Sequence, residues 1–301
     1  MASKMFKGGE VFSGRGEGLH PPTDFNSPEA GGEAHERNIS RRVEGEYSRE
    51  QPVVTAYVLR HGETTKDKLD PMRGLTEKGA EQVDEAAERL ISELDSSSDI
   101  IQIMDSGNHR ANVTVMRIAE KLKEAGFKFF EPIKTDKGGN VVEPGVKTKE
   151  DPNSRSYKKI GAANFTKEIK MKLSDPALHA ELGIPDSIPD KRIDTWFAAE
   201  WGEGAEKPAE VVDRVKQGMQ ETQKKLPMVA GQLSPEQRIV VIAAVNASVV
   251  EPIVTDYSGV PPVDRGGEVE NAEGFKVDFE VDKDPKVVVW GKDIENKIGD
   301  E

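Results

Sequence analysis

Apolar and polar residues follow one another in blocks along the middle of the chain, and these blocks predict alternating strands and helices. Residues 53–59, 100–104 and 127–130 are short apolar runs, rich in β-branched or aromatic side chains, as in buried strands. Between them, apolar residues recur at helical spacing over residues 76–94 and 109–126. This order is typical of parallel strands with helices packed on the faces of a sheet.

The C-terminal half of the chain adds further elements to this pattern. Residues 239–245 form the most apolar strand, and residues 249–254 are an apolar run that we predict as a helix with Pro252 in its first turn. Residues 275–281 alternate strictly, like a half-buried strand, and residues 287–290 are the predicted hairpin partner. We therefore predict an α/β fold, a three-layer α/β/α sandwich with a mainly parallel sheet.

Two segments depart from the alternation of strands and helices. Residues 1–50 place many glycines among charges and prolines, with few apolar residues, so we predict a disordered N-terminal tail before a domain over residues 51–301. Within that domain, residues 132–195 are rich in lysine and are predicted to be an insertion with short helices. Its lysines either present positive charge to an anionic substrate, as a lid, or form a solvated basic face.

Composition and charge exclude several functional classes. The chain has 301 residues and a formal net charge of -13, which argues against nucleic acid or an anionic membrane as a partner. It has no cysteine, so disulfides and thiolate metal sites are excluded. No run approaches about 20 consecutive apolar residues, the length that spans a bilayer, and the first residues lack the apolar core of a signal peptide. We predict a cytoplasmic protein.

The candidate chemistry lies where two predicted strands end. Arg60 and His61 directly follow the strand at residues 53–59, and Arg110 opens the helix that follows the strand at residues 100–104. Sites in open α/β sheets form outside the carboxyl ends of the strands, so these three side chains are expected to converge. Two arginines can clamp phosphate oxygens, and a neutral imidazole between them is a competent nucleophile. The start of the helix can aim backbone N–H groups at the same anion.

Several segments around these residues form a recognisable series, namely 59–64 (LRHGET), 75–79 (LTEKG), 106–114 (SGNHRANVT), 202–203 (GE), 208–215 (PAEVVDRV) and 239–250. The third segment has Ser106, three residues, Arg110-Ala111, two residues and then Thr114. In this order the chain resembles the histidine phosphatase superfamily, also called phosphoglycerate mutase-like. The resemblance covers about residues 53–255 and leaves the tail and much of the insertion unmatched.

The resemblance implies a phosphomonoesterase that needs no cofactor or metal and acts on a small phosphorylated molecule; it predicts no oligomeric state. His61 would attack the phosphoryl group and form a phosphohistidine, and Arg60 and Arg110 would hold the phosphate oxygens. The family has a second histidine after the strand at residues 239–245, where this chain has Asn246. An amide can hydrogen-bond a phosphate oxygen but supplies no charge, so either turnover is slow or the protein is a non-catalytic phospho-ligand binder.

The resemblance also requires a general acid that protonates the leaving oxygen. Glu143 is the preferred candidate because it falls in a predicted loop after the third strand, with Glu131 and Glu203 as alternatives. The loop after the first motif, residues 65–74, is short and has Asp67 where the mutase branch has an asparagine. These features favour a phosphatase over a phosphoglycerate mutase.

Overall fold

The computed structural model describes residues 51–65, 74–130, 162–188 and 190–292, together with the backbone of two short strands at residues 134–135 and 141–142. The predicted tail at residues 1–50 lies outside these ranges, as does much of the lysine-rich segment. Within the described part of that segment there are short helices, α5 (Lys167–Lys172), α6 (Pro176–Glu181) and the start of α7 (Arg192–Ala198).

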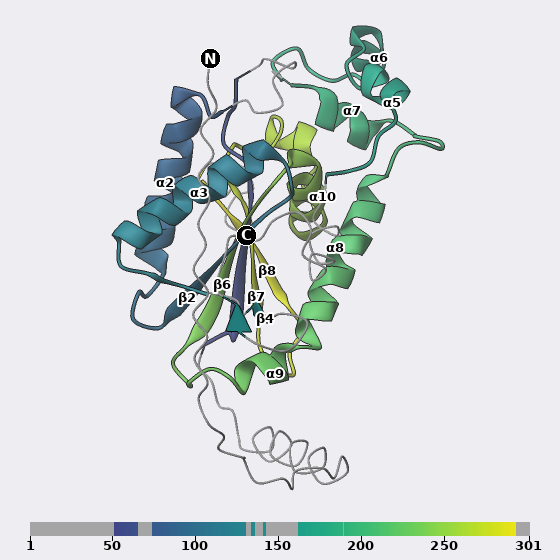
Figure 1. Cartoon of the computed structure of the whole chain (residues 1–301). Helices are drawn as coiled ribbons and strands as arrows, with labels where there is room; N and C mark the ends of the chain where they lie inside the picture. Colours follow the sequence, from purple (N-terminus) through teal and green to yellow (C-terminus); the bar gives the residue numbers. More distant parts are fainter. Residues whose placement is uncertain are drawn as a thin grey trace, which may run out of the picture. The chain divides into compact units, whose positions relative to one another are not determined.

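Six strands form one sheet in the order β3-β2-β6-β1-β7-β8. Figure 1 labels β2, β6, β7 and β8 of this sheet. Their bounds are β1 Val54–Arg60, β2 Asp99–Asp105, β3 Lys128–Phe129, β6 Arg238–Val245, β7 Gly274–Phe279 and β8 Lys286–Trp290. Strands β3, β2, β6 and β1 pair in parallel, whereas β7 and β8 are antiparallel and form a hairpin at one edge. The predicted mainly parallel sheet is confirmed. A separate pair, β4 (Lys134–Thr135) with β5 (Val141–Val142), is antiparallel.

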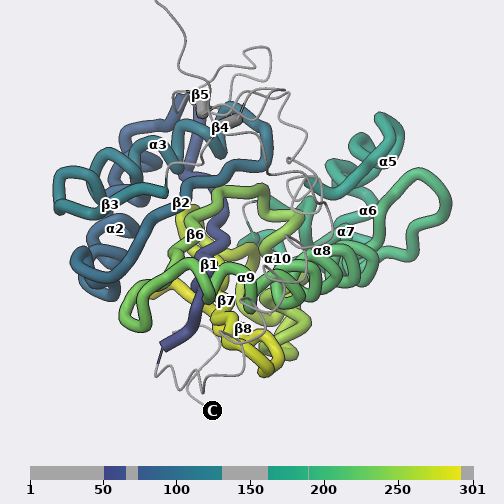
Figure 2. Tube along the Cα trace, turned by 60° about the horizontal axis from the view of Figure 1, so that its bottom comes forward, coloured from purple at the N-terminus to yellow at the C-terminus, as the bar shows by residue number. Residues whose placement is uncertain are grey.

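Helices cover both faces of the six-stranded sheet, and the strand residues that they bury alternate between the faces. On one face, Tyr57 and Leu59 of β1 pack with Val83 of α2 (Glu77–Glu93) and Ile118 of α3 (His109–Glu124). On the other face, Val58 joins a cluster supplied by α8 (Pro208–Gln223), α9 (Leu226–Ala230) and α10 (Ala247–Ser258). Figure 2 shows α2 and α3 on one side of the strands and α8 and α10 on the other. The three-layer α/β/α prediction is confirmed.

Local sequence explains where these helices begin. Thr76 caps α2, because its side chain accepts a hydrogen bond from the Gly79 N–H at 2.9 Å. Helix α10 instead begins at the end of β6, where the Asn246 carbonyl accepts the Val249 N–H at 2.9 Å. Pro252 therefore lies in the interior of α10, and the prediction that it stands in the first turn was wrong. The apolar run at residues 249–254 is the buried middle of the helix.

Across the described ranges, no helix combines the length and apolar character needed to cross a bilayer.

Helix α2 packs against the loop that follows β1 through a glycine. A Cβ atom on Gly79 would lie 1.9 Å from the carbonyl oxygen of Glu63, so the loop or the helix would have to move. We expect Gly79→Ala to lower the free energy of unfolding by about 1–3 kcal/mol through this overpacking. Urea unfolding measures the change. Glu81→Ala on the exposed side of the same helix is the control and should change stability by less than about 0.5 kcal/mol. An unchanged midpoint in Gly79→Ala would contradict the packing described.

Candidate functional site

The carboxyl ends of β2, β6 and β1 lie next to one another at one edge of the sheet. In the register, Arg60 stands opposite Val245. One residue further on, the His61 N–H donates to the Val245 carbonyl at 3.0 Å, and the Ser106 N–H donates to the Ala244 carbonyl at 3.1 Å. This edge therefore brings His61, Asn246 and the start of α3 together, because His61 and Asn246 directly follow their strands and α3 begins a short turn after β2.

His61 is buried, with 8% of its surface exposed, and its ring orientation is fixed by its own neighbour. The Nδ1 atom lies 2.8 Å from the Gly62 carbonyl oxygen. A carbonyl only accepts hydrogen bonds, so Nδ1 is the protonated nitrogen and donates to it. In the neutral ring, the lone pair is then on Nε2, which is the nucleophilic nitrogen.

Thr114 ties the His61 loop to the start of α3. Its fully buried hydroxyl accepts the Gly62 N–H at 3.1 Å and donates to the Arg110 carbonyl at 2.9 Å. The same loop also meets α2 closely, since a Cβ atom on Gly62 would lie 2.6 Å from Cγ2 of Val83. The nucleophile loop is thus held against two helices, and only glycine fits at the position after His61.

Arg110 and Asn246 are joined across the ends of β2 and β6. The Arg110 Nη2 donates to the Asn246 Oδ1 at 3.2 Å. The Asn246 side chain is buried, and its Nδ2 has no hydrogen-bond partner among the described residues. Asn246 and Asn108 are the N-cap residues of α10 and α3, and neither side chain makes a capping bond. Both helices therefore direct their positive N-terminal ends toward this edge.

Arg60 is engaged by its own chain. Its Nη2 lies 2.5 Å from Oε2 of Glu268, and its Nη1 donates to the Val269 carbonyl at 2.5 Å. Successive strand residues face opposite sides of a sheet, so Arg60 shares the side of Val58, toward α10 and the segment before β7. The expected contact of Arg60 with a ligand phosphate stays a prediction, because a carboxylate stands against the guanidinium in this structure.

Glu268 belongs to no motif, and sequence reasoning missed it. The adjacent glycines Gly266 and Gly267 mark a turn and nothing more. Its side chain is only 9% exposed, and burial raises the pKa of its carboxyl to about 7, although the nearby Arg60 charge acts in the opposite direction. A carboxyl with such a pKa changes its charge near neutral pH.

A buried ion pair holds the Glu268 segment against α10. Arg265, in the 3₁₀ helix η2 (Pro262–Arg265), donates to Glu251 Oε2 at 2.6 Å, and both side chains are almost fully buried. Glu251 Oε1 also accepts the Val269 N–H. Burial raises the pKa of the Glu251 carboxyl, while Arg265 and the Val269 bond lower it. The backbone next to Glu268 is therefore held in place by Glu251 of α10.

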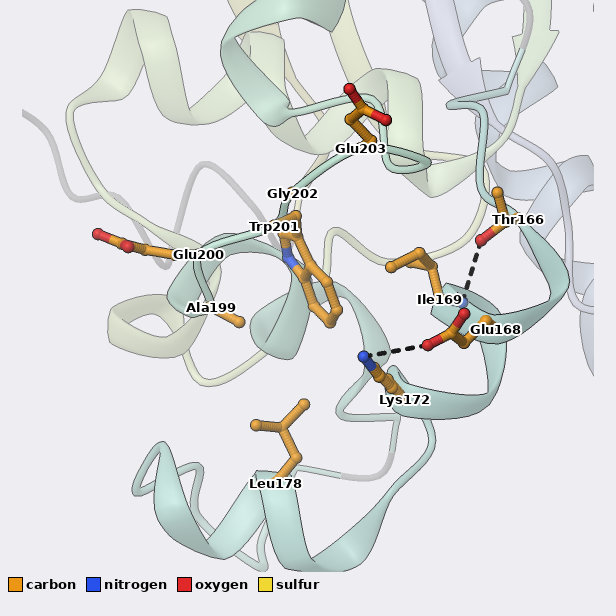
Figure 3. A pocket seen from close by; sticks show the side chains of 10 residues that line it. All are labelled: Thr166, Glu168, Ile169, Lys172, Leu178, Ala199, Glu200, Trp201, Gly202 and Glu203. Carbon is orange, nitrogen blue, oxygen red and sulfur yellow. Dashed lines mark hydrogen bonds and ion pairs between the residues drawn. The ribbon is translucent and has the colours of Figure 1, made fainter.

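The predicted general acid Glu143, its alternative Glu131 and the loop residue Asp67 all lie outside the described residues. Glu203 is described, and it is exposed on the connection between α7 and α8. It lines a surface cavity of about 320 Å³ together with Trp201 and Lys172 (Figure 3). Within the described ranges Glu203 makes no hydrogen bond to the residues around His61.

Comparison with known proteins finds similar structures but no matching sequence. The chain matches no family model and no curated protein. A mycobacterial glucosyl-3-phosphoglycerate phosphatase with inorganic phosphate is 17% identical with a TM-score of 0.42, over 79% of this chain and 97% of that one. A phosphoglycerate mutase from Bacillus anthracis is 16% identical with a TM-score of 0.44, over 83% and 96%. Bacillus stearothermophilus YhfR is 15% identical with a TM-score of 0.43, over 80% and 100%. At this distance, these likenesses assign neither activity nor substrate to this chain.

Proposed function

We propose that this protein hydrolyses small phosphomonoesters through a phosphohistidine on His61, as its motifs suggest by their resemblance to the histidine phosphatase superfamily. The single observation that carries the proposal is the hydrogen bond from His61 Nδ1 to the Gly62 carbonyl, at 2.8 Å. It selects the tautomer with the lone pair on Nε2, as a nucleophile requires. Arg110 and the N-terminal ends of α3 and α10 supply the positive field that an anionic substrate needs.

The reaction has two balanced steps. The lone pair on Nε2 of His61 attacks phosphorus, the bond to the ester oxygen breaks, and that oxygen takes a proton from a carboxylic acid, for which Glu143 is our candidate. A water molecule then attacks the phosphohistidine, the P–N bond breaks, and the carboxylate takes the proton that water gives up. The products are the alcohol and inorganic phosphate, and both His61 and the acid return to their starting states.

Asn246 sets the expected speed of this reaction. Its amide, next to Arg110, can donate a hydrogen bond through Nδ2 to a phosphate oxygen but adds no positive charge. The loss of one charged stabiliser from a phosphoryl-transfer site lowers the rate on the order of 10²- to 10³-fold. We therefore propose a slow phosphatase.

The second candidate is a protein that binds phosphorylated ligands without turning them over. Two observations favour it: Asn246 carries no charge, and the charge of Arg60 is opposed by Glu268 at 2.5 Å. The two candidates share one ligand class and one place on the molecule. They differ in whether a phosphoryl group is ever transferred to His61.

Covalent labelling distinguishes the two candidates. A phosphohistidine survives alkali and is lost in acid, so the full chain is incubated with a labelled aryl phosphate and quenched at high pH. We expect label on the peptide that contains His61, none in His61→Ala, and unchanged labelling in the control His179→Gln. His179 is a suitable control because it lies on α6, where its Nε2 hydrogen-bonds the Leu173 carbonyl oxygen. Saturable phosphate binding without label would refute the phosphatase and support the second candidate.

A further inference from the structure

We propose that Glu268 is an internal anion that competes with the ligand's phosphate for Arg60, so that ligand binding is linked to protonation of Glu268. The inference rests on the proposed function for the place where the anion binds, but not on catalysis. It assigns to Glu268 control over when the site accepts its ligand.

The geometry gives Glu268 the position of a competitor. Its Oε2 lies 2.5 Å from Nη2 of Arg60, while the Val269 carbonyl accepts from Nη1. Arg60 Nε is buried and has no partner in the described part of the chain. A carboxylate and a phosphate offer the same kind of oxygen acceptor to a guanidinium. An external anion that takes the place of the carboxylate on Nη2 must therefore displace Glu268, and an anion on the second N–H of Nη2 lies beside its negative charge.

The surroundings of Glu268 decide how firmly its charge is held. Arg60 on β1 and Arg192 at the start of α7 favour the ionised carboxylate. Asp190 before α7 and Glu251 on α10 oppose it, and each is itself bound to an arginine, Asp190 to Arg192 and Glu251 to Arg265. Burial is the largest influence and opposes the charge as well. The attraction of two arginines is thus set against burial and two neighbouring acids.

The direction of the pH dependence follows from these charges. Above about pH 7 Glu268 is ionised and opposes the charge of Arg60, so an incoming anion must displace a like charge. Below that pH the carboxyl is neutral, so no negative charge on Glu268 offsets the positive charge of Arg60. An anion on Arg60 also makes ionisation of Glu268 less favourable, so binding takes up a proton. Affinity for an anion of fixed charge should therefore rise as the pH falls.

Calorimetric titration of the full chain with sulfate tests the inference, because sulfate keeps its charge where phosphate takes up a proton. From about pH 8.5 to about pH 6 the wild-type Kd should fall by about tenfold or more. Glu268→Gln should bind at the higher pH about as tightly as wild type binds at the lower. Asp264→Asn is the matched control: it removes one negative charge from the same stretch, is exposed, and should follow wild type. Arg110→Met should weaken binding in every background.

Three results would overturn the inference. The sulfate Kd of wild type and of Glu268→Gln could depend on pH in the same way, Glu268→Gln could bind sulfate more weakly than wild type, or neither the wild type nor any variant could bind sulfate. If Glu268→Gln fails to fold, a measurement of the protons taken up on sulfate binding takes the place of this variant. In His61→Gln, titration in buffers of different ionisation enthalpy reports only protons taken up elsewhere than on His61. Uptake on binding near pH 8 is expected, and its absence counts against the competition. Covalent labelling of His61 is measured separately, so a failure of catalysis and a failure of the competition are distinguishable.

Discussion

Replacement of His61 by alanine is expected to lower hydrolysis of an aryl phosphate by about 10³-fold or more, down to the uncatalysed background. His61 is the one group in the described site with a nucleophilic lone pair held in place, through its Nδ1 bond to the Gly62 carbonyl at 2.8 Å. Alanine removes that nitrogen and leaves Arg110 and Asn246 in position. The effect should therefore appear in kcat, while the variant still binds phosphate. Steady-state kinetics with purified protein measures the rate, and calorimetric titration with phosphate measures the binding.

Two controls make the His61 result interpretable. His179→Gln changes a histidine on α6 and should retain the wild-type rate. The thermal midpoint of His61→Ala should stay close to that of the wild type, which separates lost chemistry from lost folding. Equal hydrolysis rates in wild type and His61→Ala would show that His61 is not the nucleophile, and the phosphatase proposal would then be abandoned.

Asn246→His is expected to raise the hydrolysis rate by about 10²-fold, the second largest change that we predict. Asn246 stands at the end of β6, directly before α10, and its Oδ1 accepts from Arg110 at 3.2 Å. A protonated imidazole at this position adds a positive charge beside the transferring phosphoryl group. The gain should appear in kcat more than in KM, because the charge that develops on the oxygens in the transition state interacts most strongly with it.

The control for this gain is Asn246→Ala, which removes the amide and its hydrogen bond with Arg110. It should lower the rate below that of wild type, because neither a hydrogen bond nor a charge remains at this position. If the wild type shows no hydrolysis and Asn246→His is active, the ligand-binding candidate is favoured, because the natural asparagine at this one position then keeps the protein inactive. A rate that is unchanged or lower in Asn246→His would show that Asn246 does not face the phosphoryl group.

The layers and the sheet could be predicted from sequence because the pattern is locally consistent. The apolar runs at residues 53–59 and 239–245 have the length and β-branching of buried strands, and the helix at residues 76–94 has its Thr76 cap. Pro252 was misplaced for a physical reason. Apolar spacing shows which residues of a helix are buried, but the start of α10 is set by the Asn246 carbonyl at the end of β6.

The site was predictable only where topology determines it. His61, Arg110 and Asn246 each follow a strand in the parallel part of the sheet, so pairing of these strands brings them to one edge. Glu268 follows no strand and fits no motif. It meets Arg60 because the segment before β7 returns to the end of β1, and the hydrophobic pattern contains no sign of that return. Glu143 stays a prediction, since it lies outside the described residues.

The anchoring of Val269 has a consequence for the speed of ligand exchange. The Val269 N–H is held by Glu251, and its carbonyl is held by Nη1 of Arg60. When the Glu268 carboxylate leaves Arg60, the Val269 N–H is still bound to Glu251, and the Arg60 guanidinium is still bound to the Val269 carbonyl. Replacement of the Glu268 carboxylate on Arg60 by another anion then needs the rotation of a side chain and no movement of the Val269 backbone. Rotation of one side chain is faster than loop opening or local unfolding, so this step adds no slow backbone movement to ligand exchange.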